Sequence, residues 1–237
     1  MNDFLLNTSS GDDIFSELAD GDYFVNPIPP YLSQFASREL VSDFLDKRIS
    51  TKDDSHWAQF GFEKLDEYEF WAPRLCGLIC VKMILDAVNT CSANETVATL
   101  TNKAISLGGY KVYDDSGEFI DKGWFYAPLI ELAKEYNVKG KVCTSIASSD
   151  LCYNVLSNIF TVASVHPKVI RFDIDKCPDG KKGGHLVVII GFKWAIGKCV
   201  GIYIHNPTGR EKVTQEKAFI PIERFNEAFA QRGFILC

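Results

Sequence analysis

The feature that most constrains this chain is a change in its hydrophobic periodicity near residue 169. Before that point, apolar residues recur at helical spacing in segments 74–89, 94–106, 124–137 and 149–160. After it, strand-like patterns cover 169–174, 186–193, 200–205 and 233–236, with a short helix predicted over 223–230. Helices that precede a run of strands indicate an α+β fold, in which the helices pack on an antiparallel sheet.

The N-terminal part of the chain carries weaker signals. Residues 1–26 are acidic and rich in Asp, Ser and Gly, which predicts a flexible arm. A short edge strand is expected over 28–34, helical spacing follows over 36–45, and 49–58 is expected to be a loop. We therefore predict one folded domain over 27–237.

Composition and charge exclude several classes of function. With 31 acidic and 25 basic residues the formal net charge is -6, and no basic cluster alternates with aromatic residues, so nucleic acid is not an expected partner. The N-terminus has no basic and then apolar signal pattern, and no apolar run reaches membrane-spanning length. A soluble cytoplasmic protein without a membrane partner is the expectation, and the eight scattered cysteines are expected to be reduced. Nothing predicts an oligomeric state.

Cys76 lies at the mouth of the apolar segment Leu78–Val88. A helix N-terminus and a neighbouring imidazolium both lower a thiol pKa from its ordinary value of about 8.5, which would make Cys76 a nucleophile. Gly77 would let a substrate carbonyl approach the Cys76 N–H. Alternatively, Cys76 is a small core residue, or it forms a metal site with Cys80; no third ligand at useful spacing accompanies the pair. We expect neither a metal nor another cofactor.

The chain has four histidines, and one has the context of a general base. His185 follows Gly183 and Gly184 and begins the buried run Leu186–Ile190, so it would be held on a rigid strand end. Gly184 would leave room for a substrate strand. His205 is the rival, while His56 and His166 are expected to be structural or solvated.

Asn206 follows His205 directly, and neighbouring residues on a strand face opposite sides. An inward Asn206 would accept the ring N–H of His185 and fix its tautomer. Cysteine, histidine and asparagine in this order are the parts of a papain-type thiol catalyst, whose members meet in the fold and not in the sequence.

Three stretches of the chain are informative together: Cys76–Leu85, Gly183–Phe192 and Ile204–Gly209. They resemble the papain-like superfamily of bacteriocin-processing, double-glycine peptidases, family thirty-nine, and its stand-alone relatives. The resemblance covers about residues 27–237 and implies a papain-like α+β fold with peptide or protein substrates. Such families usually carry Cys-Gly-Pro-x-Ser/Thr, Gly-His-x-Val-Val and Asp-Pro; here Leu78, Cys80 and Asn206 replace the proline, the hydroxyl residue and the aspartate.

The resemblance also implies an oxyanion glutamine. Family members place it in a short Tyr-x-Ser-Gln strand, and Gln34 ends the matching stretch Tyr31–Gln34, which lies 42 residues before Cys76. Residues of about 35–70 would then be an insertion. The other interpretation is that Gln34 simply ends an edge strand.

These inferences predict a cysteine peptidase in which Cys76 attacks a peptide carbonyl to give a thioester acyl-enzyme. His185 is the expected base and acid, Asn206 orients it, and Gln34 donates to the oxyanion. The same triad would serve an acyltransferase, an amidase or a transpeptidase, because it sets acyl transfer and not the acceptor. A catalytically silent peptide-binding module is the remaining alternative.

Overall fold

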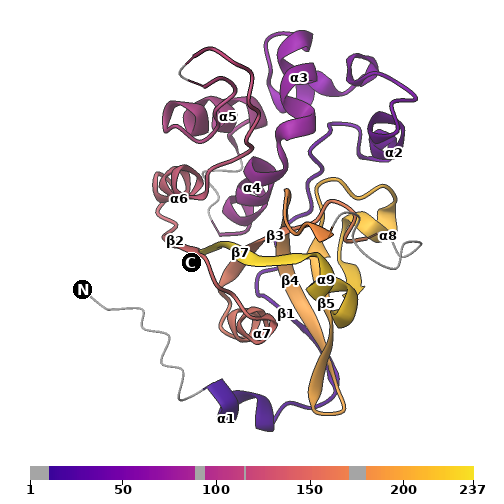
Figure 1. The fold of residues 1–237 in the computed structure, drawn as a ribbon, viewed down its shortest axis with the longest axis vertical. Coiled ribbons are helices and arrows are strands. Elements are labelled where there is room, and N and C mark those ends of the chain that lie inside the picture. Colours follow the sequence, from indigo (N-terminus) through magenta and orange to yellow (C-terminus); the bar gives the residue numbers. More distant parts are fainter. Residues whose placement is uncertain (1–10, 89–93, 115, 171–179) are drawn as a thin grey trace.

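In a computed structural model, which describes residues 11–88, 94–114, 116–170 and 180–237, the chain has an α+β fold built around one antiparallel sheet (Figure 1). The strand order is β2-β7-β3-β4-β5-β6, and β1 pairs with the far end of β4. The strands are β1 Gly21–Phe24, β2 Gly140–Cys143, β3 Phe160–Val165, β4 His185–Ala195, β5 Lys198–His205, β6 Ala218–Pro221 and β7 Phe229–Leu236.

Helices cover both faces of the sheet. The α-helices are α1 Gly11–Ser16, α2 Val41–Leu45, α3 Leu65–Trp71, α4 Cys76–Val88, α5 Val97–Ser106, α6 Tyr126–Lys134, α7 Ser148–Leu156, α8 Lys212–Gln215 and α9 Ile222–Ala228. Short 3-10 turns cover Arg38–Leu40, Thr51–Asp53, Trp57–Phe60 and Ala72–Arg74. In Figure 1, α2 to α6 gather at the upper end of the sheet and α7 lies lower, beside β1.

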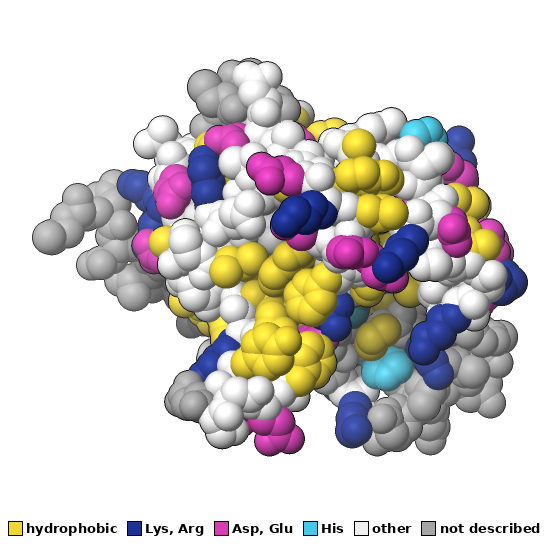
Figure 2. Space-filling model, turned by 90° about the horizontal axis from the view of Figure 1, so that it is seen from above, with side chains coloured by type: hydrophobic (Ala, Val, Ile, Leu, Met, Phe, Trp, Pro, Cys, Tyr) yellow, Lys and Arg dark blue, Asp and Glu magenta, His cyan; other side chains and the backbone are white. Residues whose placement is uncertain are grey.

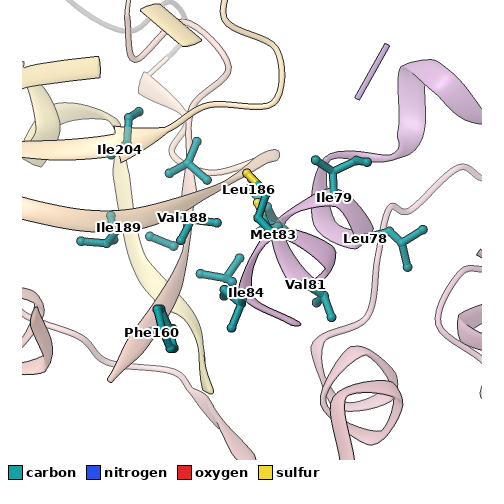
Figure 3. Packing of buried hydrophobic residues seen from close by; sticks show 14 of the residues in the cluster. Leu78, Ile79, Val81, Met83, Ile84, Phe160, Leu186, Val188, Ile189 and Ile204 are labelled. Carbon is teal, nitrogen blue, oxygen red and sulfur yellow. The ribbon is translucent and has the colours of Figure 1, made fainter. Parts of the chain in front are cut away.

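The core lies between α4 and the central strands. Every residue of α4 from Gly77 to Leu85 is buried, and the helix packs on β3 and β4. Figure 3 shows Met83 and Ile84 directed toward side chains of the sheet, whereas Leu78 points away from it on the other side of α4. Because α7 contacts β4 as well, residues 185–192 of this strand are buried on both faces, which explains their continuous apolar run.

The structure confirms the four predicted helices, which are α4, α5, α6 and α7, although their ends differ from the predicted ones. It also confirms the short helix predicted over 223–230, which is α9, and the strands β4, β5 and β7. It corrects the prediction of a helix over 149–160, because α7 ends at Leu156 and Phe160 already begins the central strand β3. The predicted strand over 169–174 is wrong at Val169 and Ile170, which lie in a turn; its other residues fall outside the described part.

The N-terminal predictions also need correction. The edge strand expected over 28–34 is irregular chain, whereas Gly21–Phe24 forms β1. Val25 is 1% exposed, so the flexible arm cannot extend to residue 26. Charge content misled the prediction here, because the aromatic residues Tyr23 and Phe24 pack on β4 and β5 and offset the polar composition around them.

Candidate active site

Cys76 is the first residue of α4, where the Ala72–Arg74 turn passes into the helix. Its thiol is half-buried and lies against the beginning of β4, where it meets the backbone N–H of Leu186 as well as those of Gly77 and Cys76 itself. These N–H groups stabilise a negative sulfur. The helix therefore presents the thiol to the strand that carries His185.

Gly77 lets α4 approach its neighbours closely. A Cβ atom at this position would lie 2.9 Å from Leu186 Cδ1 and 2.9 Å from Trp124 Cδ1. The indole N–H of Trp124 donates to the carbonyl of Arg74 at 2.6 Å, which fixes the ring beside the helix start. Gly77 is buried, so close packing is a reason for glycine here that is separate from the predicted approach of a substrate carbonyl.

His185 begins β4 opposite Val165 of β3 and is 5% exposed. Its Nε2 lies 2.8 Å from Asn206 Oδ1. An amide oxygen only accepts, so Nε2 carries the ring proton in the neutral form and Nδ1 is the free base. Asn206 Nδ2 is buried and has no hydrogen-bond partner within the described residues.

Thr208, which the sequence analysis did not single out, completes this group. Its backbone N–H donates to Asn206 Oδ1 at 3.1 Å, which identifies that atom as the oxygen of the amide. Its hydroxyl lies 2.9 Å from His185 Nε2 and 3.2 Å from Asn206 Oδ1. The hydroxyl thus accepts from the ring N–H while it donates to the amide oxygen. Threonine two residues beyond an asparagine is common in turns, so no sequence signal identified it.

Burial acts on the two reactive groups in opposite directions. Desolvation raises the pKa of the Cys76 thiol, although the nearby backbone N–H groups lower it in part. Desolvation lowers the pKa of His185 to about 4, against a smaller rise from the hydrogen bond to Asn206. This corrects the expectation of a depressed thiol pKa, because removal of water favours the neutral thiol and neutral imidazole over separated charges.

Gln34 is brought back to the site despite the 42 residues that separate it from Cys76. Its backbone N–H donates to the Pro207 carbonyl at 3.1 Å, and its side-chain Nε2 donates to the Ala72 carbonyl at 3.0 Å. Oε1 is buried without a hydrogen-bond partner in the described part of the chain. One Nε2 hydrogen remains for another acceptor.

Two pockets meet at Cys76, His185 and Gly184. The first, of about 440 Å³, extends toward Tyr110 and the segment Asp121–Trp124. The second, of about 320 Å³, extends toward Gln34, Thr208 and other residues. Gly184 lines both with a φ of +96°, a conformation that favours glycine. Figure 2 shows a hollow that holds a histidine beside a broad area of hydrophobic side chains.

The rival assignments take structural positions. His205 is 1% exposed, its Nδ1 accepts from the Lys217 N–H at 3.1 Å, and its Nε2 lies 3.0 Å from the Pro29 carbonyl. Cys80 is fully buried one turn beyond Cys76, and no group of three potential metal ligands occurs among the described residues. The described cysteines are unpaired, and Cys237 is exposed; Cys91 and Cys177 lie outside the described residues.

Helix α4 begins with a cysteine and packs on an antiparallel sheet whose central strand β4 begins with a histidine. This arrangement is that of the papain-like class of folds. Within this class, the chain belongs to the Peptidase_C39 like family, whose model matches residues 57–236. The match covers α4, the strand β4 that begins with His185, and Asn206, which directly follows β5; it begins after Gln34.

Solved structures resemble this one, among them the following two. A protein from Bacillus anthracis assigned as a C39-like peptidase matches with a TM-score of 0.54 and 15% identity, over 92% of this chain and 98% of that one. The peptidase domain of Streptococcus ComA, described as a bifunctional ABC transporter in a quorum-sensing pathway, matches with a TM-score of 0.45 and 17% identity, over 70% and 92% of the chains. The first likeness supports the fold. No curated protein matches the sequence. In the described part of the chain, the helices are too short or too polar to cross a membrane.

Proposed function

We propose that the protein is a cysteine peptidase that uses Cys76 as nucleophile, His185 as base and acid, and Asn206 as the residue that orients His185. The observation that carries this proposal is the hydrogen bond between His185 Nε2 and Asn206 Oδ1, 2.8 Å long. It leaves Nδ1 unprotonated on a residue that lines the same two pockets as Cys76. Membership in a peptidase family supports the same reading.

In the first step, His185 Nδ1 takes the thiol proton as Cys76 Sγ attacks the peptide carbonyl carbon. Because burial opposes separated charges, the thiolate and imidazolium form together as a neutral pair. The carbonyl oxygen becomes an oxyanion, which the Cys76 N–H and the remaining Gln34 Nε2 hydrogen would hold. Asn206 Oδ1 and the Thr208 hydroxyl keep the imidazolium oriented.

In the second step, the oxyanion collapses, the carbon–nitrogen bond breaks, and His185 returns its proton to the leaving amine. This leaves a thioester on Cys76. A water molecule gives a proton to His185 Nδ1 and attacks the thioester, which releases the carboxylic acid product and restores the thiol. No cofactor takes part in either step.

The proposal is tested by incubating the protein with a diverse peptide library and reading cleavage sites by mass spectrometry. The expected result is a set of cleaved peptides whose new C-termini take up one ¹⁸O atom from labelled water. Cys76→Ala should remove all cleavage. Transfer of the acyl group to an added amine without ¹⁸O uptake would instead identify an acyltransferase or transpeptidase, and no cleavage or transfer would contradict the proposal.

A further inference from the structure

The two pockets beside Cys76 are rich in positive charge although the whole chain carries a net charge of -6. The first pocket is lined by Arg74, Lys122 and Arg232, and the second by Lys168 and Arg210. These five residues lie in five different segments of the chain, so folding brings the cations together. The charge of the pocket lining is thus opposite in sign to the net charge of the protein.

Two of these cations are neutralised by carboxylates. Arg74 Nε lies 2.9 Å from Asp121 Oδ2, and its guanidinium also stacks on the Phe70 ring at 4.2 Å. Arg210 forms an ion pair with Asp46. Asp121 is the one carboxylate that lines either pocket within the described residues, and it also accepts the Tyr110 hydroxyl. It is thus committed to partners on the protein.

The other three cations have no carboxylate partner among the described residues. Lys122, Lys168 and Arg232 are exposed, and in the described part of the structure their side chains form no ion pair. Lys122 follows the Arg74–Asp121 pair, Lys168 follows β3, and Arg232 lies in β7, where its Nη2 would meet a side chain at Gly183 at 3.2 Å. Their positions flank the Cys76–His185 centre on both sides.

Three uncompensated cations at the mouth of a hollow raise the local concentration of anionic ligands and favour their binding. We propose that the substrates are acidic peptides, with Asp or Glu close to the scissile bond on both sides of it. The inference rests on the proposed peptidase function and adds the chemical class of its substrate. Figure 2 shows Lys and Arg side chains around a hollow on this face of the molecule.

The first test compares kcat/KM for matched peptides. Starting from a cleaved library peptide, each position within three residues of the scissile bond is changed in turn to Glu, Gln and Lys. Glu should be preferred over Lys by about three- to tenfold at one or more positions, since an exposed ion pair contributes up to about fivefold and like charges repel. The preference should shrink at 0.5 M salt. Equal rates for Glu and Lys at all positions would overturn the inference.

Charge reversals identify the residues responsible. Lys122→Glu, Lys168→Glu and Arg232→Glu change exposed side chains, so folding should be unaffected. Each should lower the preference for Glu about threefold or more at the peptide positions nearest to it. Lys198→Glu is the matched control, because it makes the same charge change beyond the opposite end of β4 from His185. An equal effect of Lys198→Glu would show a bulk charge effect and contradict the site.

A binding measurement separates this inference from the proposed function. Fluorescent Glu-rich and Lys-rich peptides of equal length are titrated with the Cys76→Ala variant, which cannot turn over. Tighter binding of the Glu-rich peptide, weakened by Lys122→Glu and not by Lys198→Glu, supports the acidic class even if no library peptide is cleaved. Cleavage without any charge preference would support the peptidase function and contradict the inference of acidic substrates.

Discussion

The two ends of β4 are built in contrasting ways. At its first residue, His185 joins Asn206 and Thr208 in a polar group whose members depend on one another for hydrogen bonds. At its other end, Trp194 is 8% exposed and stacks on Phe15 with ring centroids 5.5 Å apart. One end holds polar atoms away from water, and the other covers an aromatic cluster.

The difference shows where the strand carries stability and where it carries chemistry. The aromatic end buries apolar area, which stabilises the fold without positioning any reactive group. The polar end leaves Asn206 Nδ2 and Gln34 Oε1 without partners among the described residues, an arrangement that a purely structural core would avoid. Substitutions at the two ends should therefore separate activity from folding.

The largest effect is expected for the base. His185→Ala should lower kcat/KM by about 10⁴-fold or more, equivalent to about 5 kcal/mol, because nothing else then takes the thiol proton. His205→Ala should retain chemistry but lose stability, since both of its ring nitrogens are occupied by the backbone. Steady-state rates and melting temperatures measured together check this, and a larger loss of turnover for His205→Ala would reverse the assignment.

Next in size is the loss at the aromatic end. Trp194→Ala should lower the free energy of unfolding by about 3–5 kcal/mol, because it removes a buried indole that packs on Phe15 and Phe192. Below its melting range, the variant should cleave peptides at the parent rate. Urea unfolding and a rate assay at low temperature measure the two quantities. A folded variant with lost activity would break the comparison between the ends.

Gln34→Ala tests the oxyanion donor. Acylation should slow by about 10²–10³-fold, or roughly 2.7–4 kcal/mol, whereas alkylation of Cys76 by iodoacetamide should not change. Acylation and not alkylation should be affected because Gln34 donates to the Ala72 carbonyl beside the start of α4, where an oxyanion would form. A single-turnover acylation rate within about threefold of the parent would mean that the donor lies elsewhere.

The buried imidazole predicts a pH dependence of stability. The pKa of His185 is lowered to about 4 in the folded protein, against an ordinary value of about 6.5 in the unfolded chain. The unfolded state therefore binds more protons between these values, so stability is full above pH 6.5 and falls as the pH drops toward 4. The loss due to His185 should be about 3 kcal/mol. It should be absent in His185→Gln, measured by urea unfolding at both pH values; an identical profile in both proteins would contradict it.

The smallest effect is expected for Thr208. Thr208→Val removes the hydroxyl that bonds to His185 Nε2 and Asn206 Oδ1 while it keeps the side-chain shape. We expect a loss of about fivefold in kcat, near 1 kcal/mol, with KM unchanged, and recovery in Thr208→Ser. If Thr208→Ser were as slow as Thr208→Val, the hydroxyl would not be what positions the ring.

Hydrophobic periodicity predicted the helix that begins at Cys76 and the strand that begins at His185, because both are long apolar segments that are almost entirely buried. It failed at β3, whose six buried residues continue directly from a helical pattern. It also failed at β1, a four-residue strand that depends on tertiary pairing with β4.

The candidate site divides in the same way. Cys76, His185 and Asn206 were predicted from local context, and the structure brings Cys76 and His185 to the same pockets and joins His185 to Asn206. Thr208 and Trp124 contact the site through the fold alone, so no local pattern indicated them. The pKa directions depend on burial, which the sequence does not contain.

The most direct test of the central claim is single-turnover mass spectrometry of the intact protein after rapid mixing with a cleaved peptide and acid quenching. The account predicts a transient adduct with the mass of the peptide's acyl part, which proteolytic mapping assigns to Cys76 and which hydroxylamine removes, as expected of a thioester. The adduct should build up further when hydrolysis is slowed at low temperature. Peptide cleavage by the parent without such an adduct, or with the adduct on another cysteine, would contradict the account.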